Sequence, residues 1–192
     1  MQIRAEQTRK ALISAAAGLI DLKGLRDTGL VEVSNAAGVS KGALYFHFSC
    51  KEGLASAVHE ETHQRVRRLA ERHLCGPDPD LATLARFLTQ LFAELREDTT
   101  LRAGLRLESE DRAADGEGPL PLRQAWLRYL DRHFTFPGDL AALPHLLAAV
   151  TVGLEVLGRK DAHWWTEETV DGVWELLLRL VPQSPESEPA DR

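Results

Sequence analysis

A pair of histidines four residues apart offers the most explicit chemistry in the sequence. Residues 59–63 read His-Glu-Glu-Thr-His, which matches the pattern H-E-x-x-H. On a helix, two histidines at this spacing share one face and can bind zinc, with the intervening glutamate as general base. The match makes a zinc-dependent hydrolase, acting through His59, Glu60 and His63, one hypothesis for the chain.

The surroundings of this motif favour a different interpretation. No strand pattern lies nearby to hold a substrate, and no third ligand follows at the spacing typical of zinc hydrolases. The motif also lies inside a predicted helix that joins two parts of the chain. We therefore expect an exposed polar helix face here, with no catalytic residues, no metal and no other cofactor, and keep the hydrolase as an alternative.

A second segment, beginning at Ser40, has the composition of a helix that enters a DNA groove. Ser40 can cap the helix, whose N-terminus offers donors to a phosphate. Lys41 can reach a guanine edge or a phosphate, and Gly42 lets the backbone approach DNA closely. Tyr45 and His47 supply further donors about one turn along the same helix.

The elements around this segment predict a helix-turn-helix. Residues 4–22 carry a helical apolar stripe, Thr28 can cap a short second helix, and Gly38 breaks the chain before the third. Leu44 and Phe48 are expected to face inward and hold the third helix on its supports. Two short helices joined by a tight glycine turn are typical of this motif.

The rest of the chain also carries the helical period, and sustained alternation of apolar and polar residues is missing, so we predict an all-α fold. The further helices are expected at about 50–73, 80–97, 100–109, 121–135, 139–159 and 165–181. A cluster of glycine and prolines at 76–79 marks a boundary. We expect a DNA-binding domain at 1–49, a connecting helix at 50–75, a ligand-binding and dimerisation domain at 76–182, and a flexible tail at 183–192.

Charge divides the 192 residues into two unlike parts. Up to Cys75 the chain has 11 basic and 8 acidic residues, whereas the remainder has 12 basic and 21 acidic ones. The basic first part is the candidate for an anionic partner. Two cysteines make no disulfide framework, and no apolar run reaches 18 residues, so we expect a cytoplasmic protein that does not enter the membrane.

Two stretches go beyond generic helix patterns. Residues 36–48 and 51–54 closely resemble the signature of the tetracycline-repressor (TetR) family, and the resemblance covers about residues 4–60. It implies a homodimeric, all-α regulator whose N-terminal three-helix unit binds an operator and whose C-terminal helices bind a small molecule. By motif position, the residues that it assigns to DNA contacts are Thr28, Ser40, Lys41, Gly42, Tyr45, His47 and Lys51.

One branch of that family, the γ-butyrolactone autoregulator receptors of actinobacteria, resembles the chain further. Residues 41–48 are typical of that branch, and Pro121 precedes Trp126 by five residues, as in receptors where this tryptophan covers the lactone. The resemblance implies a ligand site at Trp126. Pseudo-receptors of the same branch bind other signals, so a regulator with a different ligand, or with none, remains a second alternative.

The residues themselves suggest how such a site could be completed. A tryptophan face gives a flat apolar wall and its indole N–H adds a donor. Further apolar walls could come from Leu84, Leu88, Leu91 and Phe92, and hydrogen bonds from Gln64 and Thr151. The last two predicted helices carry more apolar surface than one subunit could bury, so we expect them to form the homodimer. These features predict a repressor that binds a palindromic operator and is released by a small, mostly apolar molecule.

Overall fold

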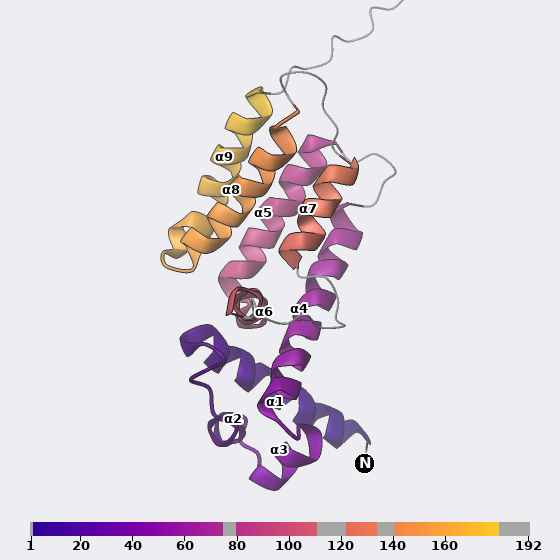
Figure 1. Ribbon diagram of the computed structural model, residues 1–192, viewed down its shortest axis with the longest axis vertical. Helices are drawn as coiled ribbons and strands as arrows, with labels where there is room; N and C mark the ends of the chain where they lie inside the picture. The colour runs from indigo at the N-terminus through magenta and orange to yellow at the C-terminus, as the bar shows by residue number, and fades with distance from the viewer. Residues whose placement is uncertain (1, 75–79, 111–121, 134–140, 181–192) are drawn as a thin grey trace, which may run out of the picture.

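The structure of the protein is a computed structural model, and it describes residues 2–74, 80–110, 122–133 and 141–180. Every regular element within these ranges is a helix, as the sequence predicts (Figure 1). The predicted boundary at 76–79, the tail at 183–192 and the segment that contains Pro121 lie outside the described residues.

Three helices form a unit at the N-terminal end of the molecule (Figure 1). They are α1 (Gln2–Lys23), α2 (Leu30–Ala36) and α3 (Lys41–His47). Their shared core includes the fully buried side chains of Leu12, Val33 and Leu44, one from each of the three helices. Gly38, at φ 65°, makes the tight turn between α2 and α3, because a left-handed backbone suits glycine.

Helix α4 (Lys51–His73) leaves this unit and runs along the C-terminal helices (Figure 1). Its first half packs into the N-terminal core through Leu54 and Val58, and its second half reaches the C-terminal core through Leu69. One continuous helix thus belongs to both units, so a displacement of its far end would be transmitted to α1–α3.

The C-terminal unit contains the remaining helices of the described chain. They are α5 (Leu81–Glu97), α6 (Thr99–Glu110), α7 (Leu122–His133), α8 (Leu143–Gly158), the 3₁₀ turn η2 (Ala162–Trp165) and α9 (Glu167–Leu180). Phe92 and Leu88 of α5, Leu147 of α8 and Trp174 of α9 lie at its centre.

Helix α6 joins the two units. Ala103 and Leu107 on one side of it pack into the N-terminal core, while Leu105 on the other side packs into the C-terminal core. Gly104 lets α6 approach α4 closely, because a Cβ at this position would overlap the side chain of Thr62. The Thr62 hydroxyl in turn donates to the carbonyl of Thr100 at 2.8 Å, which locks the crossing of the two helices.

Two helix starts differ from the sequence-based expectation. Thr28 does not cap α2; its hydroxyl donates to the carbonyl of Gly24 at 2.7 Å, and Gly29 takes the N-cap position. The last helix was expected to begin at about 165, yet residues 162–165 form η2 and α9 begins at Glu167. Burial of Trp165, whose indole N–H donates to the carbonyl of Leu154 at 2.9 Å, explains this separate turn.

No helix in the described ranges is both long and apolar enough to cross a membrane.

Candidate functional site

The outer face of α3 presents polar and aromatic side chains on the basic part of the molecule. Ser40 caps the helix by accepting the N–H of Ala43 at 3.2 Å. Lys41 and Gly42 are exposed, and 53% of Tyr45 is accessible. Leu44 and Phe48 face inward, as predicted from their spacing of four residues. The inner side of α3 is therefore anchored by core contacts, while its outer side is exposed to solvent.

The remaining residues assigned to DNA contact lie differently. His47 is half-buried between Phe46 and Phe48. The Lys51 ammonium donates to the carbonyl of Arg26 at 2.8 Å, beside the N-terminus of α4. Thr28 is 4% exposed and its hydroxyl donates to the carbonyl of Gly24, so its side chain is not accessible on the surface of this subunit.

Phe46 is a surface residue that the sequence analysis overlooked. Its side chain is 80% exposed, next to Tyr45 on the outer face of α3. The inward positions of Leu44 and Phe48 could have revealed it, because residues one and two places after an inward residue turn away from the core. An exposed apolar ring on a short polar helix suggests contact with another molecule.

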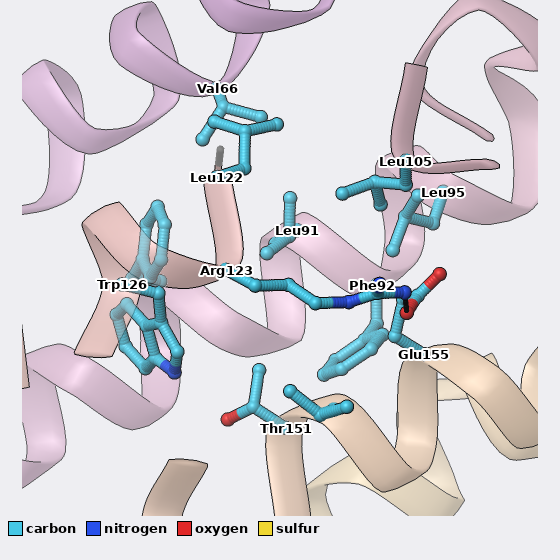
Figure 2. Close-up of a pocket in the computed structure, with 12 residues that line it drawn as sticks. Val66, Leu91, Phe92, Leu95, Leu105, Leu122, Arg123, Trp126, Thr151 and Glu155 are labelled. Atoms are coloured by element: carbon cyan, nitrogen blue, oxygen red, sulfur yellow. Dashed lines mark hydrogen bonds and ion pairs between the residues drawn. The ribbon is translucent and has the colours of Figure 1, made fainter. Parts of the chain in front are cut away.

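A small cavity of about 80 Å³ lies within the C-terminal unit (Figure 2). Five helices contribute to its lining, and its walls are predominantly apolar. The lining residues are Val66 of α4; Phe87, Leu91, Phe92 and Leu95 of α5; Leu105 of α6; Leu122, Arg123 and Trp126 of α7; and Thr151, Val152 and Glu155 of α8.

Polar groups are confined to a few positions around this cavity. The indole N–H of Trp126 is buried and has no hydrogen-bond partner among the described residues. The Thr151 hydroxyl donates to the carbonyl of Leu147 at 2.8 Å, which leaves its oxygen able to accept a bond. Arg123 pairs with Glu155 (Figure 2). Glu155 is also paired with Arg159. The lining of the cavity is thus mostly apolar and includes a few groups that can form hydrogen bonds, such as Trp126 and Thr151.

The structure brings together four of the seven residues predicted for a ligand site, namely Trp126, Leu91, Phe92 and Thr151. It does not bring the other three to the cavity. Leu84 and Leu88 are fully buried in the core, and the Gln64 amide donates to Glu60 at 2.9 Å. Helical spacing could not distinguish core from cavity on α5, because the residues of both lie on the same apolar side of that helix.

Arg123 and Glu155 were missed by the sequence analysis. A carboxylate within the apolar run of α8 was a usable signal, since a buried charge requires a partner. The partners come from α7 and from the end of α8 itself, and both guanidinium groups lie within hydrogen-bonding distance of the Glu155 carboxylate. The sequence shows that Glu155 is charged, but it does not show which arginines compensate that charge in the folded protein.

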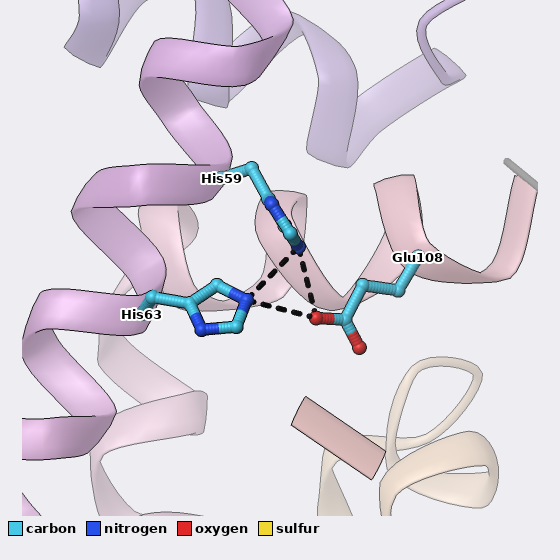
Figure 3. Close-up of side chains that lie close together, drawn as sticks. All are labelled: His59, His63 and Glu108. Atoms are coloured by element: carbon cyan, nitrogen blue, oxygen red, sulfur yellow. Dashed lines mark hydrogen bonds and ion pairs between the residues drawn. The ribbon is translucent and has the colours of Figure 1, made fainter. Parts of the chain in front are cut away.

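The histidines of the H-E-x-x-H match are not the exposed polar face that we expected. The side chains of His59 and His63 are 24% and 8% exposed, and both Nε2 atoms face one oxygen of Glu108 from α6 (Figure 3). The Nε2–Oε1 distances are 2.9 Å for His59 and 3.4 Å for His63, and the two Nε2 atoms lie 3.1 Å apart. Glu60 remains exposed and outside this cluster.

The surroundings of Glu108 lower the pKa of its carboxyl group well below the usual value. Burial alone would raise the pKa of its carboxyl group, but hydrogen bonds from His59, His63 and the backbone N–H of Leu122 outweigh that effect and lower the pKa to about 2. The Leu122 N–H donates at 2.8 Å to the same oxygen, Oε1, that faces the histidines. The other oxygen, Oε2, is buried and has no hydrogen-bond partner among the described residues.

Apolar side chains remain exposed on the outer side of the C-terminal unit. They belong to α8, η2 and α9, which lie together at the edge of the bundle (Figure 1). The largest exposed fractions there are those of Leu146, Val156, Leu157, Trp164 and Leu176. Trp165 and Trp174, by contrast, are each 3% exposed and pack inside the subunit.

Comparisons with known proteins found a family model that matches the N-terminal unit and solved structures that resemble almost the whole chain. Residues 12–58 match the family model described as bacterial regulatory proteins, tetR family. The A-factor receptor protein of Streptomyces griseus is 35% identical over 118 residues, which is 62% of this chain and 41% of the receptor. The chain therefore spans less than half the length of that curated relative.

Two solved structures are similar over almost the whole chain. A γ-butyrolactone receptor described as ArpA-like is 31% identical with a TM-score of 0.75, and covers 92% of this chain and 88% of its own. CprB of Streptomyces coelicolor, solved in complex with its operator, is 36% identical with a TM-score of 0.71 over 92% and 88%. The chain belongs to the TetR family of DNA-binding regulators, which are not enzymes, and within it resembles the γ-butyrolactone receptors.

Proposed function

We propose that this protein is a cytoplasmic transcriptional repressor that binds a palindromic operator as a homodimer and releases it when a small amphiphilic molecule occupies the C-terminal cavity. The observation that carries the proposal is the combination of a free α3 surface with an apolar cavity that α4 borders. Val66 of α4 lines that cavity, and the same helix continues into the core of the N-terminal unit.

The DNA-binding surface consists of Ser40, Lys41, Gly42, Tyr45 and Phe46, with Lys51 and His47 at its edge. Lys41 and the N-terminus of α3 supply the positive potential that phosphates or guanine edges require. Gly42 has open space where a Cβ would stand, with Ser40 Oγ at 3.9 Å as its nearest neighbour. Because Gly42 has no side chain, the backbone at the start of α3 can approach the DNA groove closely.

A dimer through α8 and α9 explains the exposed apolar side chains there. Leu176 is 64% exposed and Val156 is 44% exposed, although both belong to otherwise well-packed helices. Association would remove this surface from water, at roughly 25 cal/mol for each Å² buried. Two-fold symmetry then presents two α3 helices to successive major grooves of a palindrome.

The cavity supports an amphiphilic ligand with an alkyl portion and oxygen acceptors. Leu91, Phe92 and Leu95 suit an alkyl chain, while the unpartnered Trp126 N–H suits a carbonyl oxygen. A γ-butyrolactone with an aliphatic side chain has both parts. We therefore assign the ligand to this class, which is also the class in the description of the ArpA-like receptor.

The size of the cavity supplies a mechanism for release. Sites for small molecules typically occupy roughly 300–1,000 Å³, so a cavity of about 80 Å³ must expand to admit one. Expansion would press on Val66 and shift α4, and α4 carries the N-terminal unit with it. A shift from 99:1 to 1:99 between the DNA-binding and released conformations requires about 5.5 kcal/mol of differential binding.

Selection of binding sites from random duplexes tests the DNA-binding half of the proposal. The full-length protein should enrich one palindrome, and a labelled duplex of that sequence should bind one or two dimers with an affinity that falls as salt rises. Enrichment of no sequence, or equal affinity for a scrambled duplex, would contradict the proposal. Retention of ordinary operator binding without any ligand response would instead favour the pseudo-receptor alternative.

A further inference from the structure

We propose that His59, His63 and Glu108 form a binding site for one divalent transition-metal ion, for which zinc is the best fit. This inference does not rest on the proposed function, because it concerns the crossing of α4 and α6 rather than the cavity or the α3 surface. The three ligand atoms lie within 4.8 Å of one another (Figure 3).

The donor set is that of known zinc sites. Two imidazole nitrogens and one carboxylate oxygen are a recurrent set of three protein ligands, and a fourth position then holds water. Imidazole also suits nickel, copper and iron, whereas calcium and magnesium prefer oxygen ligands alone. The pair of histidines from α4 and the single carboxylate from α6 therefore select a transition metal.

The separations between the donor atoms also fit. Zinc binds nitrogen and oxygen at about 2.0–2.2 Å, so two ligands of a tetrahedral ion lie about 3.3–3.5 Å apart. The three separations here are 2.9, 3.1 and 3.4 Å. Outward movements of a few tenths of an ångström in two side chains would place an ion among all three atoms.

The three donor atoms lie around a single point. Each imidazole Nε2 and the carboxylate oxygen can present a lone pair to a cation. The two Nε2 atoms lie 3.1 Å apart, and they lie 2.9 and 3.4 Å from Glu108 Oε1. A metal ion among the three atoms would accept one lone pair from each of them.

Burial supports a built site instead of a chance surface cluster. The Glu108 side chain is 3% exposed, and its Oε2 atom is buried with no hydrogen-bond partner among the described residues. That oxygen is available for a second bond to the ion or for a metal-bound water. His59, at 24% exposure, leaves a path by which an ion could enter.

The two helices hold the ligands in place. One residue before His63, the Thr62 hydroxyl donates to Thr100 of α6, and Gly104 lies one turn before Glu108 at the point of closest approach. The Leu122 N–H adds a bond from the start of α7 to Glu108. A bound ion would therefore fasten α4 to α6.

The ligands also explain why the site differs from a zinc hydrolase. In that motif the glutamate after the first histidine acts as general base. Here Glu60 is exposed and accepts a hydrogen bond from Gln64, and the third ligand comes from a separate helix 45 positions beyond His63. We assign the ion a structural role at the crossing of α4 and α6, without catalysis.

Zinc binding to the chelator-treated full-length protein tests the proposal by calorimetry and by metal analysis after dialysis. The wild type should bind one zinc per subunit and melt at a higher temperature with zinc present, because the ion binds the folded state. His63→Ala and Glu108→Gln should each weaken zinc binding by at least about 10–100-fold. Glu60→Gln and His145→Ala should bind zinc as the wild type does, since both side chains are exposed and outside the cluster.

Cobalt provides an independent readout of the ligands. Substituted into the wild type, it should give the visible absorption of a four-coordinate ion, and that absorption should disappear in His59→Gln. This variant changes the most exposed ligand and so should fold even if the buried substitutions do not. The proposal would be overturned if His59→Gln bound zinc as tightly as the wild type does. It would also be overturned if no ligand variant changed the number of zinc ions bound per subunit.

Discussion

Arg123 of α7 and Glu155 of α8 form an ion pair in the lining of the apolar cavity in the C-terminal unit. Glu155 is 6% exposed and has a second partner in Arg159, so one buried carboxylate compensates two guanidinium groups. The pair connects the helix that carries Trp126 with the helix that forms the edge of the bundle. It therefore links the wall of the cavity to the expected dimer surface.

Removing the Glu155 charge should destabilise the protein strongly. Glu155→Gln leaves Arg123 and Arg159 without their shared carboxylate, and breaking a buried pair in this way typically costs about 3–5 kcal/mol, reduced here because the two arginines are partly exposed. We expect a loss of roughly 2–3 kcal/mol in the free energy of unfolding. Denaturant unfolding measures it.

The matched control is Glu175→Gln on α9. Glu175 also pairs with an arginine four residues away, but both side chains are at least 70% exposed. Exposed pairs of this kind contribute between zero and about 1 kcal/mol. Equal destabilisation by the two substitutions would show that the buried network has no special role.

Gly158 should tolerate no side chain. A Cβ at this position would overlap the indole of Trp165, which is fixed by its hydrogen bond to Leu154. Gly158→Ala should therefore cost at least about 2 kcal/mol through overpacking and loss of that bond. Gly18→Ala is the control, because α1 has open space there; it should be neutral or stabilise by up to about 1 kcal/mol. Thermal unfolding of both variants checks the difference, which vanishes if Trp165 is free to move.

Substitutions on α3 should reduce operator affinity while leaving the fold and the dimer intact. Lys41→Ala and Tyr45→Ala remove exposed side chains, and each should cost about 1–3 kcal/mol of binding if it reads a base. A lysine that contacts phosphate alone should instead weaken all sequences evenly and reduce the salt slope by about one. Fluorescence anisotropy measures both, and Lys160→Ala at the end of α8 serves as the control.

Gly42→Ala tests how closely α3 approaches the DNA. The added methyl group meets no atom of the protein closer than 3.9 Å, so stability should not fall. Operator affinity should decrease by about tenfold or more, because the methyl group would lie between the helix and the groove. Unchanged affinity would place another face of the helix against DNA.

Trp126→Ala should give a stable repressor that no longer responds to ligand. Trp126 is half-buried at the cavity, stacked on Tyr129 with ring centroids 5.9 Å apart. Loss of a cavity wall should cost less stability than the roughly 3–5 kcal/mol typical of a core tryptophan. Trp174→Ala, which removes a side chain only 3% exposed, supplies that comparison. If Trp126→Ala melts as low as Trp174→Ala and loses operator binding, Trp126 is a core residue.

The helices could be predicted from the sequence because apolar residues recur at helical spacing along most of the chain. The separation of η2 from α9 could not, since it depends on Trp165 meeting Gly158 and Leu154 across the bundle. Local propensity gives no information on such contacts between residues distant in sequence. Residue type alone favours Thr28 as the cap of α2, but in the structure its hydroxyl donates to the carbonyl of Gly24 instead.

The candidate sites, too, could be predicted where they depend on local sequence but not where they depend on contacts between distant residues. The front of α3 could be predicted, because a single turn of helix with two inward residues determines which positions face outward. The cluster of His59, His63 and Glu108 could not, because the third residue lies 45 positions beyond His63 on another helix. The cavity falls between these cases: the apolar residues of α5 were recognised, but their division between core and cavity depends on where α7 and α8 pack.

The measurement that tests the central claim most directly is a titration of a synthetic γ-butyrolactone with an alkyl side chain into the complex of the wild-type dimer and its selected operator, followed by fluorescence anisotropy. We predict complete release at saturating ligand for the wild type, with Trp126→Ala remaining bound over the same range. Release of both proteins alike, or a wild type that stays on the operator while the ligand is shown by calorimetry to bind, would contradict a ligand-controlled repressor that senses through this cavity.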